Sequence, residues 1–376
     1  MPDYRQEIPF FDTAIYNPKQ RSQIDLAIQS VLDHGKYING PEVYEFSEKL
    51  STYLNVKHVV PCANGTDALT ISLLALDLQR GDEVIVPVFN YVAAAEAVEI
   101  LGLTPAFIDV SNKDFNIEVK EIEKRINSKT KAIIITHLFG AAAKIDHIVD
   151  LAHKYNIAVI EDIAQAVGTE LNQRKVGTYG DIGCISFFPT KNLACFGDGG
   201  AIITNNEVIA NKAKMIANHG QTNKYEHKIA GCNSRLDTLQ AAILSVQLLY
   251  LEDNLNKRRA IAEKYQDGLK DISEICLPVQ QQNSFHTFNQ YCILLRSKEV
   301  REELQNDLKN SGIGVMIYYP KPLHIQEAFA RYEHKVNDFP VAEDLCNRIL
   351  ALPVFPDLRE EQLQYIISQI RNFFNQ

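Results

Sequence analysis

Several features that mark specialised protein classes are missing from this sequence. Its seven cysteines are scattered, and no two of them stand in CxxC spacing. Such an odd, dispersed set argues against a disulfide framework or a zinc site and is typical of a reducing cytoplasm. Histidines such as His137, His153 and His227 also lack metal-ligand spacing, so we interpret them as structural or solvent-facing. We therefore expect no metal site.

Long apolar segments and excess positive charge are missing as well. No run of about 18 apolar residues occurs that could cross a membrane. Residues 1–7 lack a signal-peptide core. With 38 Lys and Arg against 47 Asp and Glu, the formal net charge is −9, which argues against nucleic acid as a partner. We expect a cytoplasmic protein without a membrane partner, in which a local basic pocket could still bind a small anion.

The pattern that is present predicts an α/β enzyme. A chain of 376 residues, 46% hydrophobic, suits a large domain plus a smaller one. Short apolar strands alternate with amphipathic helices, which predicts a mostly parallel sheet covered on both faces. The strands expected along the chain are 56–61, 83–87, 104–109, 132–136, 157–162, 291–295 and 314–317. We expect the large domain in residues 1–255 and the smaller one in residues 256–376.

Lys191 lies in the most informative stretch, residues 186–200. A lysine amine is a poor nucleophile while protonated, and its ordinary pKa is about 10.4. Desolvation between strands or a neighbouring cation would lower that pKa and let the amine attack a carbonyl. Upstream, Asp162 ends an apolar strand. An acid paired with a Schiff-base lysine is the arrangement that pyridoxal phosphate (PLP) requires, so both residues are candidates for catalysis.

Other residues have two interpretations when taken singly. Asn64-Gly65-Thr66-Asp67 follows a strand and opens a helix, which would aim backbone N–H groups at a phosphate. A helix cap by Thr66 or Asp67 explains the same residues. Ser186 could add a hydroxyl to the phosphate or be an ordinary strand serine. Tyr91 offers a ring face for stacking, or is a plain core aromatic.

Together these blocks resemble the DegT/DnrJ/EryC1/StrS family, the nucleotide-sugar aminotransferases of PLP fold type I. The block around Lys191 is the most specific. The matching segments cover nearly the whole chain: residues 34–41, 63–69, 161–166, 186–193, 197–200, 218–220, 233–242 and 323–326. The resemblance implies a large PLP-binding domain with a mostly parallel sheet between helices, and a smaller C-terminal α/β domain.

The resemblance also implies a role for each matching residue. Lys191 would hold PLP as a Schiff base and then move a proton, while Asp162 would pair with the pyridine nitrogen. Gln165 would pack against the ring or hydrogen-bond it near its phenolic oxygen. The residues implied to bind the cofactor are Gly65, Thr66, Tyr91, Asp162, Gln165, Ser186, Lys191 and Asn233.

A homodimer follows from the same resemblance. Asn233 matches an asparagine that crosses a dimer interface to the partner's cofactor phosphate, so each active site would be shared. Arg235 lies close to that interface in sequence and could meet a donor carboxylate or the nucleotide phosphates. A structural ion pair is equally open for Arg235.

The implied reaction moves an amino group from L-glutamate to a nucleotide-linked keto-sugar. Residues 62–69 and 233–244 look most like enzymes that aminate C3 of a UDP-linked 2-acetamido-3-oxo sugar or its uronic acid, for surface polysaccharide such as lipopolysaccharide. Tyr318-Tyr319-Pro320 departs from the His-Tyr-Pro of many relatives. The change removes a cation beside the sugar and disfavours an acidic sugar, and it makes Tyr318 and Tyr319 candidates for substrate binding.

Two alternatives stay open. The first is a 4-keto-6-deoxy nucleotide-sugar 4-aminotransferase. The second is a PLP-binding sugar dehydratase or a non-catalytic member of the family. Related dehydratases replace the Schiff-base lysine with histidine, and a silent member would lack the lysine or the acid. The presence of both Lys191 and Asp162 argues against the second alternative.

Overall fold

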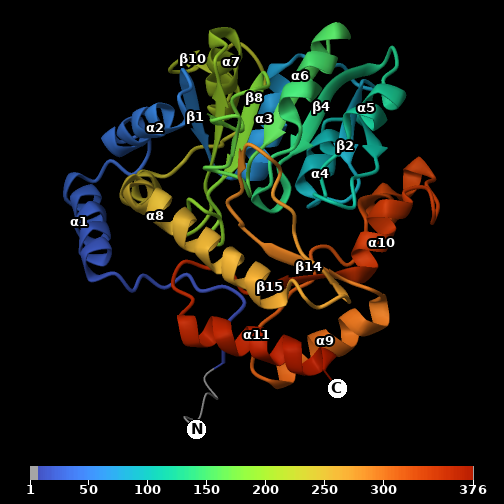
Figure 1. Cartoon of the computed structure of the whole chain (residues 1–376). Helices are drawn as coiled ribbons and strands as arrows, with labels where there is room; N and C mark the ends of the chain where they lie inside the picture. Colours follow the sequence, from blue (N-terminus) through green and yellow to red (C-terminus); the bar gives the residue numbers. More distant parts are fainter. Residues whose placement is uncertain (1–6, 376) are drawn as a thin grey trace.

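The computed structural model describes residues 7–375, and its largest element is a seven-stranded sheet (Figure 1). In spatial order the strands are β1 (His58–Cys62), β9 (Gly200–Thr204), β8 (Ile182–Ser186), β5 (Ala158–Asp162), β4 (Thr130–Thr136), β2 (Glu83–Pro87) and β3 (Thr104–Ile108). Strand β9 runs antiparallel to both of its neighbours, whereas the other neighbouring pairs are parallel. The mostly parallel sheet predicted from the sequence is confirmed.

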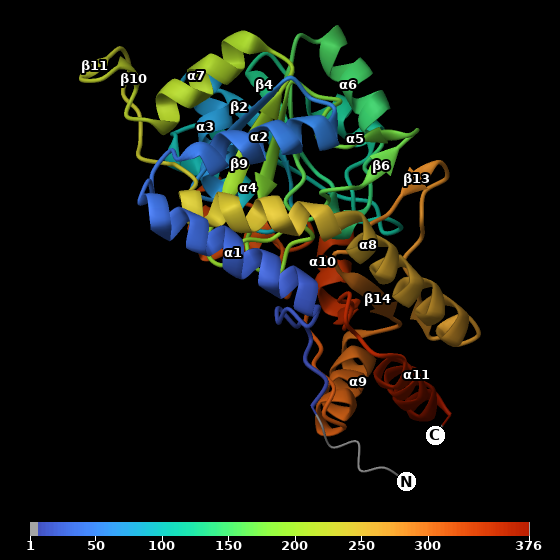
Figure 2. The same cartoon turned by 90° about the vertical axis from the view of Figure 1, so that its left-hand side faces the viewer.

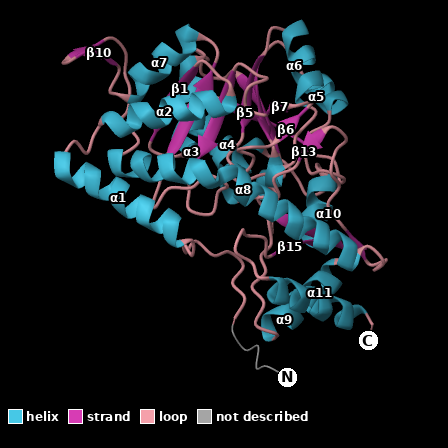
Figure 3. Ribbon diagram, turned by 60° about the vertical axis from the view of Figure 1, so that its left-hand side comes forward, coloured by secondary structure: helices cyan, strands magenta, loops and turns pink. Residues whose placement is uncertain are grey.

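Helices cover this sheet, and others, among them the last helix of the chain, lie apart from it in the C-terminal part of the molecule (Figure 3). The helices are α1 (Pro18–His34), α2 (Pro41–Leu54), α3 (Gly65–Ala75), α4 (Ala93–Ile100), α5 (Val119–Arg125), α6 (Ile145–Lys154), α7 (Glu207–Ala217), α8 (Thr238–Leu269), α9 (Lys298–Asn310), α10 (Pro340–Arg348) and α11 (Glu360–Phe374). Every residue of β5 after Ala158 is buried, and a strand without an exposed side is covered on both faces. Within residues 7–375, none of the helices has both the length and the apolar character needed to cross a membrane.

Short elements complete the fold. Three smaller sheets are formed by β12 (Ile275–Cys276), β14 (Tyr291–Leu295) and β15 (Ile349–Leu352), by β13 (Ser284–Phe285), β6 (Glu170–Leu171) and β7 (Arg174–Lys175), and by β10 (Gln221–Asn223) and β11 (Glu226–His227). The β10–β11 hairpin projects from the body of the molecule, and α1 and α2 pack along α8 (Figure 2). The 3₁₀ helices are η1 (Leu138–Gly140), η2 (Leu323–Ile325) and η3 (Glu327–Tyr332).

The sequence pattern places most strands to within two residues, with one error. Residues 314–317, expected as a strand, make only isolated bridges, from Met316 to Ala351 and, just before them, from Ile313 to Ile8. A Cβ added at Gly314 would lie 2.5 Å from the backbone nitrogen of Phe10. The chain thus pairs with the N-terminal segment at Ile313 and with β15 at Met316. Because the partner changes within a few residues, no continuous strand ladder forms.

Two hydrophobic cores share elements of both halves of the chain. On β14, Cys292 packs into the larger core and Ile293 into the smaller one, because successive strand side chains point to opposite faces. Helix α8 contributes Leu255 to the larger core and Ile261 to the smaller. The expected domain division after residue 255 falls inside this continuous helix and stays a prediction.

Candidate active site

The carboxyl ends of four parallel strands meet at a cavity of about 560 Å³. The chain after β2 supplies Tyr91, and β4, β5 and β8 end at Thr136, Asp162 and Ser186. Open α/β sheets bind their ligands at this edge. Nine of the residues that the sequence assigns to the site line the cavity, namely Gly65, Thr66, Tyr91, Asp162, Gln165, Ser186, Lys191, Tyr318 and Tyr319.

Asp162 is a nearly buried carboxyl group at the floor of this cavity, with 8% of its surface exposed. Its Oδ1 accepts a hydrogen bond from the backbone N–H of Ala164 at 3.0 Å. Thr136 Oγ1 lies 3.5 Å from its Oδ2. Burial raises the pKa of Asp162, while the Ala164 N–H and the charge of Lys191 oppose that shift. The carboxylate therefore lacks a strong cationic partner that would favour its charged form.

Lys191 lies in the loop after β8 and lines the same cavity as Asp162. Its backbone N–H donates to the carbonyl oxygen of Phe188 at 2.9 Å, which closes a turn. Burial lowers the pKa of the Lys191 amine, and the charge of Asp162 partly restores it. Desolvation is therefore the effect that favours the neutral, nucleophilic amine, as expected from the sequence.

The start of α3 forms a cradle for an anion. Asn64 Oδ1 accepts from the backbone N–H of Asp67 at 2.8 Å, so Asn64 caps the helix. The alternative cap by Thr66 or Asp67 is therefore wrong. The first turn of a helix leaves the N–H groups of Gly65 and Thr66 without intrahelical acceptors, and these can hold a phosphate. A Cβ added at Gly65 would lie 2.7 Å from the Cβ of Ser186. Glycine here brings the helix N-terminus against the Ser186 hydroxyl, so the donors fit a phosphate ester.

Two aromatic residues and Gln165 shape the wall above this cradle. Tyr91 is 58% exposed, and its ring centroid lies 6.4 Å from that of Tyr319. The plain core position that the sequence left open for Tyr91 is therefore wrong. Gln165 Nε2 donates to the Tyr319 hydroxyl at 3.1 Å, and its Oε1 accepts from the Phe139 N–H at 2.8 Å. These bonds fix the carboxamide at the cavity surface.

Asn233 and Arg235 lie outside the cavity. Asn233 is exposed and forms a backbone bridge with Asn218. Arg235 is partly exposed, and its Nη1 lies 3.5 Å from Asn218 Oδ1. Over residues 7–375 Arg235 has no carboxylate at ion-pair distance, so the structural ion pair that the sequence left open is absent there. Both side chains lie where a second subunit could meet them.

Sequence reasoning missed several residues that line the cavity. Thr136 ends a strand that the sequence did predict, and Asn90 Nδ2 donates to its hydroxyl at 2.8 Å. The position at a strand end was a usable signal for Thr136. Gln290 comes from the loop before β14, far along the chain, and no local motif marks it. The others are Asn64, Asp67, Leu69, Ala93, Ala164, Cys184, Ile185, Phe188, Thr190 and Asp198.

The three histidines differ in environment. His137 is fully buried, and its Nε2 lies 2.9 Å from Oε2 of the buried Glu161. Because His137 Nδ1 accepts from the Ala143 N–H, its Nε2 carries the proton and donates to Glu161. His153 and His227 are exposed.

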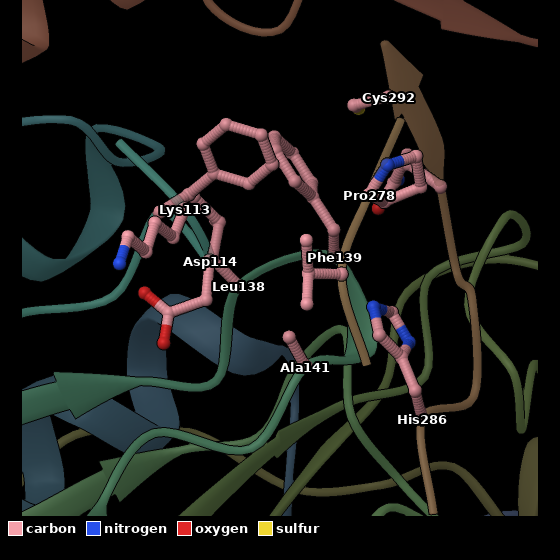
Figure 4. A pocket seen from close by; sticks show the side chains of 11 residues that line it. Lys113, Asp114, Leu138, Phe139, Ala141, Pro278, His286 and Cys292 are labelled. Atoms are coloured by element: carbon pink, nitrogen blue, oxygen red, sulfur yellow. The ribbon is translucent and has the colours of Figure 1, made fainter. Parts of the chain in front are cut away.

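A second cavity, drawn in Figure 4, lies where the segments around Phe139 and His286 meet. The imidazole of His286 and the thiol of Cys292 come from the C-terminal part of the chain, whereas Lys113 and Asp114 lie on the other side (Figure 4). Its volume of about 10 Å³ admits about one water molecule. This space is too small for a substrate.

Comparison with known proteins identifies the chain. Residues 18–371 match the DegT/DnrJ/EryC1/StrS aminotransferase family. The chain belongs to this family. It is 40% identical to a UDP-N-acetyl-3-dehydro-alpha-D-glucosamine 3-aminotransferase from Acidithiobacillus ferrooxidans, over 97% of each chain. It is 39% identical to a UDP-2-acetamido-2-deoxy-3-oxo-D-glucuronate aminotransferase from Pseudomonas aeruginosa, over 97% of this chain and 100% of that one.

The fold of this family member also matches solved structures over nearly its whole length. The structure of DesV from Streptomyces venezuelae, in complex with a ketimine intermediate, superposes with a TM-score of 0.95 at 34% identity, over 98% of this chain and 99% of that one. The protein is therefore a PLP-dependent transaminase of the DegT/DnrJ/EryC1/StrS family. The predicted family, fold, enzyme class and cofactor are confirmed.

Proposed function

We propose that this aminotransferase transfers the amino group of L-glutamate to C3 of a UDP-linked 2-acetamido-3-oxo sugar. The names of the relatives from A. ferrooxidans and P. aeruginosa support this choice, since both act on 3-oxo sugars linked to UDP and both align over the full length. The observation that carries the proposal is the meeting of Lys191, Asp162 and the α3 cradle in one cavity. We place the reaction in the cytoplasm and its product in surface polysaccharide such as lipopolysaccharide.

The residues of the cavity have separate tasks. PLP, when bound, supplies an electron sink for breaking the Cα–H bond of the amino donor. The N–H groups of Gly65 and Thr66 and the Ser186 hydroxyl would hold its phosphate. Asp162 would accept a hydrogen bond from the ring nitrogen and keep the proton there, because a buried carboxylate favours a cationic partner.

Proton transfer falls to Lys191. Its amine would take the proton from the donor Cα and return it at C4′ of the cofactor. Burial favours the form of the amine that can accept a proton, since burial lowers the pKa of Lys191. Tyr91 would stack on the ring and Gln165 would hold the ring near its phenolic oxygen, while Tyr318 and Tyr319 border the sugar.

The charge of the cavity favours a neutral sugar over a uronic acid. Among the lining residues within 7–375, Lys191 is the one lysine or arginine, whereas Asp67, Asp162 and Asp198 are acidic. An additional carboxylate on the sugar would meet uncompensated negative charge. This balance also supports a homodimer, because the partner's Asn233 and Arg235 would supply donors for the nucleotide phosphates and the glutamate carboxylate.

The test is a substrate panel analysed by mass spectrometry. The holoenzyme is mixed with L-glutamate and UDP-, GDP- and dTDP-linked keto-sugars, and the products are weighed and fragmented. We expect an amine at C3 of the UDP-2-acetamido sugar and slower turnover of its uronic acid. Amination at C4 of a 6-deoxy sugar, or a keto-deoxy product without amine transfer, would overturn the proposal.

Lys191→Ala is the matching control for the chemistry. We expect this variant to lose transamination, since no other lysine or arginine among residues 7–375 lines the cavity. The near-visible absorbance of the bound cofactor should change as well. A variant that keeps both the absorbance and the turnover would show that another group does the work assigned to Lys191.

A further inference from the structure

The loop that carries Lys191 is held by a residue from the C-terminal part of the chain. Asn289 lies in the segment between β13 and β14, next to the smaller core. Its Nδ2 donates to the carbonyl oxygen of Thr190 at 3.2 Å and to Oδ1 of Asn192 at 3.2 Å. These acceptors, a backbone carbonyl oxygen just before Lys191 and a side-chain oxygen just after it, belong to the two residues that flank the lysine.

Further hydrogen bonds continue from Asn289 and from the lysine loop. Asn192 Nδ2 donates to the carbonyl oxygen of Val167 at 3.2 Å, which ties the lysine loop to the segment after β5. On the other side, the guanidinium of Arg258 donates to the carbonyl oxygens of Asn289 at 3.5 Å and Val354 at 2.5 Å. Arg258 is 2% exposed, and it lies on α8, which joins the two cores.

Arg258 keeps its charge in this position. Burial lowers the pKa of Arg258 to about 10, so the guanidinium is still a cation at neutral pH. Hydrogen bonds from a charged donor are shorter and stronger than neutral ones. The short contact of Arg258 is the one to Val354, whereas the carbonyl oxygens of Phe288 and Asn289 lie at 3.4 and 3.5 Å, so Arg258 places the segment around Asn289 mainly through α8 and Val354.

Packing alone does not explain an asparagine here. Asn289 is 2% exposed, and its Oδ1 is buried without a hydrogen-bond partner among residues 7–375. A leucine would fill a similar volume without burying an unsatisfied acceptor. What asparagine offers, and leucine lacks, is the pair of N–H donors aimed at Thr190 and Asn192.

We propose that Asn289 is a positioning residue for Lys191, which couples the smaller core to the geometry of proton transfer. The proposal rests on the proposed role of Lys191. Lys191 must reach the donor Cα and then the cofactor, and a shift of about 1 Å in a reacting group costs on the order of 10²-fold in rate. Asn289 acts on Lys191 only through its neighbours, namely the backbone of Thr190 and the side chain of Asn192.

The experiment compares holoenzymes that carry Asn289→Leu and Tyr265→Phe. Tyr265 is buried in the smaller core and donates to the Pro353 carbonyl oxygen at 2.9 Å, so its variant also loses a buried hydrogen bond without touching the lysine loop. For Asn289→Leu we expect faster amide hydrogen exchange in residues 190–194, with and without cofactor. We also expect kcat to fall about tenfold or more while KM for glutamate changes little.

A pH titration of the cofactor absorbance gives an independent readout. Loosening the loop changes the surroundings of the Lys191 nitrogen, so the midpoint of that titration should shift in Asn289→Leu and stay in place in Tyr265→Phe. Asn192→Ala, which removes one acceptor from the other side, should reproduce the faster exchange and serves if Asn289→Leu folds poorly.

The outcomes separate this proposal from the function itself. Unchanged exchange in residues 190–194 together with an unchanged titration midpoint would overturn the positioning role. Faster exchange with wild-type kcat would also overturn it, because proton transfer by Lys191 would then not depend on the order that Asn289 gives to the loop. Transamination retained by Lys191→Ala would instead refute the proposed function, whatever the exchange of the loop.

Discussion

At the scale of single residues, Asp162 and Lys191 both lie where burial disfavours the charged form of the side chain. Burial raises the pKa of the Asp162 carboxyl and lowers the pKa of the Lys191 amine. Each charge partly compensates the other, yet desolvation is the first cause in both cases. Such pKa shifts are common in functional sites, because a group that interacts with a ligand lacks that interaction while the ligand is absent.

The pKa shift of Asp162 leads to a prediction for Asp162→Asn. A raised pKa means that the folded protein disfavours the ionised carboxylate, so stability falls as the pH rises from the ordinary value of 3.8 toward the raised value. In the protein stripped of cofactor, Asp162→Asn should therefore raise the free energy of unfolding at neutral pH. Near pH 3.8 the gain should be much smaller, because the wild-type carboxyl is then largely protonated. Urea denaturation at the two pH values measures the difference.

Cofactor binding should reverse that order. Asparagine cannot supply the negative charge that holds a proton on the ring nitrogen, so Asp162→Asn should bind PLP more weakly than the wild type. Equilibrium titration of the stripped protein with PLP checks this. A stripped variant that is less stable than the wild type at neutral pH would mean that attraction to Lys191 outweighs burial.

At the scale of elements, the end of β5 presents two acids to two different environments. Asp162 lines the cavity, whereas Glu161 points to the other face of the strand and is fully buried. Glu161 accepts from the backbone N–H groups of Gly177, Tyr179 and Gly180, each at 2.7 Å. The Glu161 carboxylate also accepts a hydrogen bond from His137. These bonds fix the turn before β8 against β5, the strand that carries Asp162.

Glu161→Ala should therefore cost stability without removing any group from the cavity. The variant leaves buried donors unsatisfied, and we expect the free energy of unfolding to drop by about 3 kcal/mol or more. Urea denaturation provides the measurement. Glu361→Ala, at an exposed position of α11, is the control and should change stability by about 0.5 kcal/mol at most. A loss no larger than the control's would show that water replaces the carboxylate.

At the scale of the whole molecule, the active site as formed by one chain is short of cations. Lys191 supplies the single lysine or arginine of the cavity within residues 7–375, yet PLP, glutamate and a nucleotide sugar all carry negative charge. Asn233 and Arg235 lie on the surface outside the cavity. In the proposed homodimer these residues would enter the partner's cavity and supply the missing donors.

Subunit mixing tests this arrangement. We expect Asn233→Ala and Lys191→Ala each to be impaired when alone. When they are mixed by co-expression, each heterodimer regains one intact site, so random pairing should restore about a quarter of wild-type transamination. Full activity of Asn233→Ala alone, or no recovery in the mixture, would contradict shared sites. Light scattering of the mixed protein confirms that dimers are present.

Local patterns in the sequence determined the fold class, the cofactor and the principal pair of the site. β2 and β5 each contain a short run without polar residues, 84–86 and 158–160, and such runs favour burial on both faces. Asp162 ends β5, a predicted strand, so strand order placed this acid at the sheet edge where open α/β sheets bind ligands. The strand before Lys191, β8, was not predicted, and the family resemblance paired Lys191 with Asp162.

Only the tertiary structure decided which distant groups hold that pair in place. Asn289 contacts Thr190 and Asn192 across about a hundred residues of sequence, and Gln165 meets Tyr319 over a still longer separation. Asn64, rather than Thr66, caps α3 because its side chain turns back to the Asp67 N–H. Such contacts depend on how segments far apart in the sequence pack against one another. The side-chain periodicity of a single segment predicts its own helix or strand but not its distant partners.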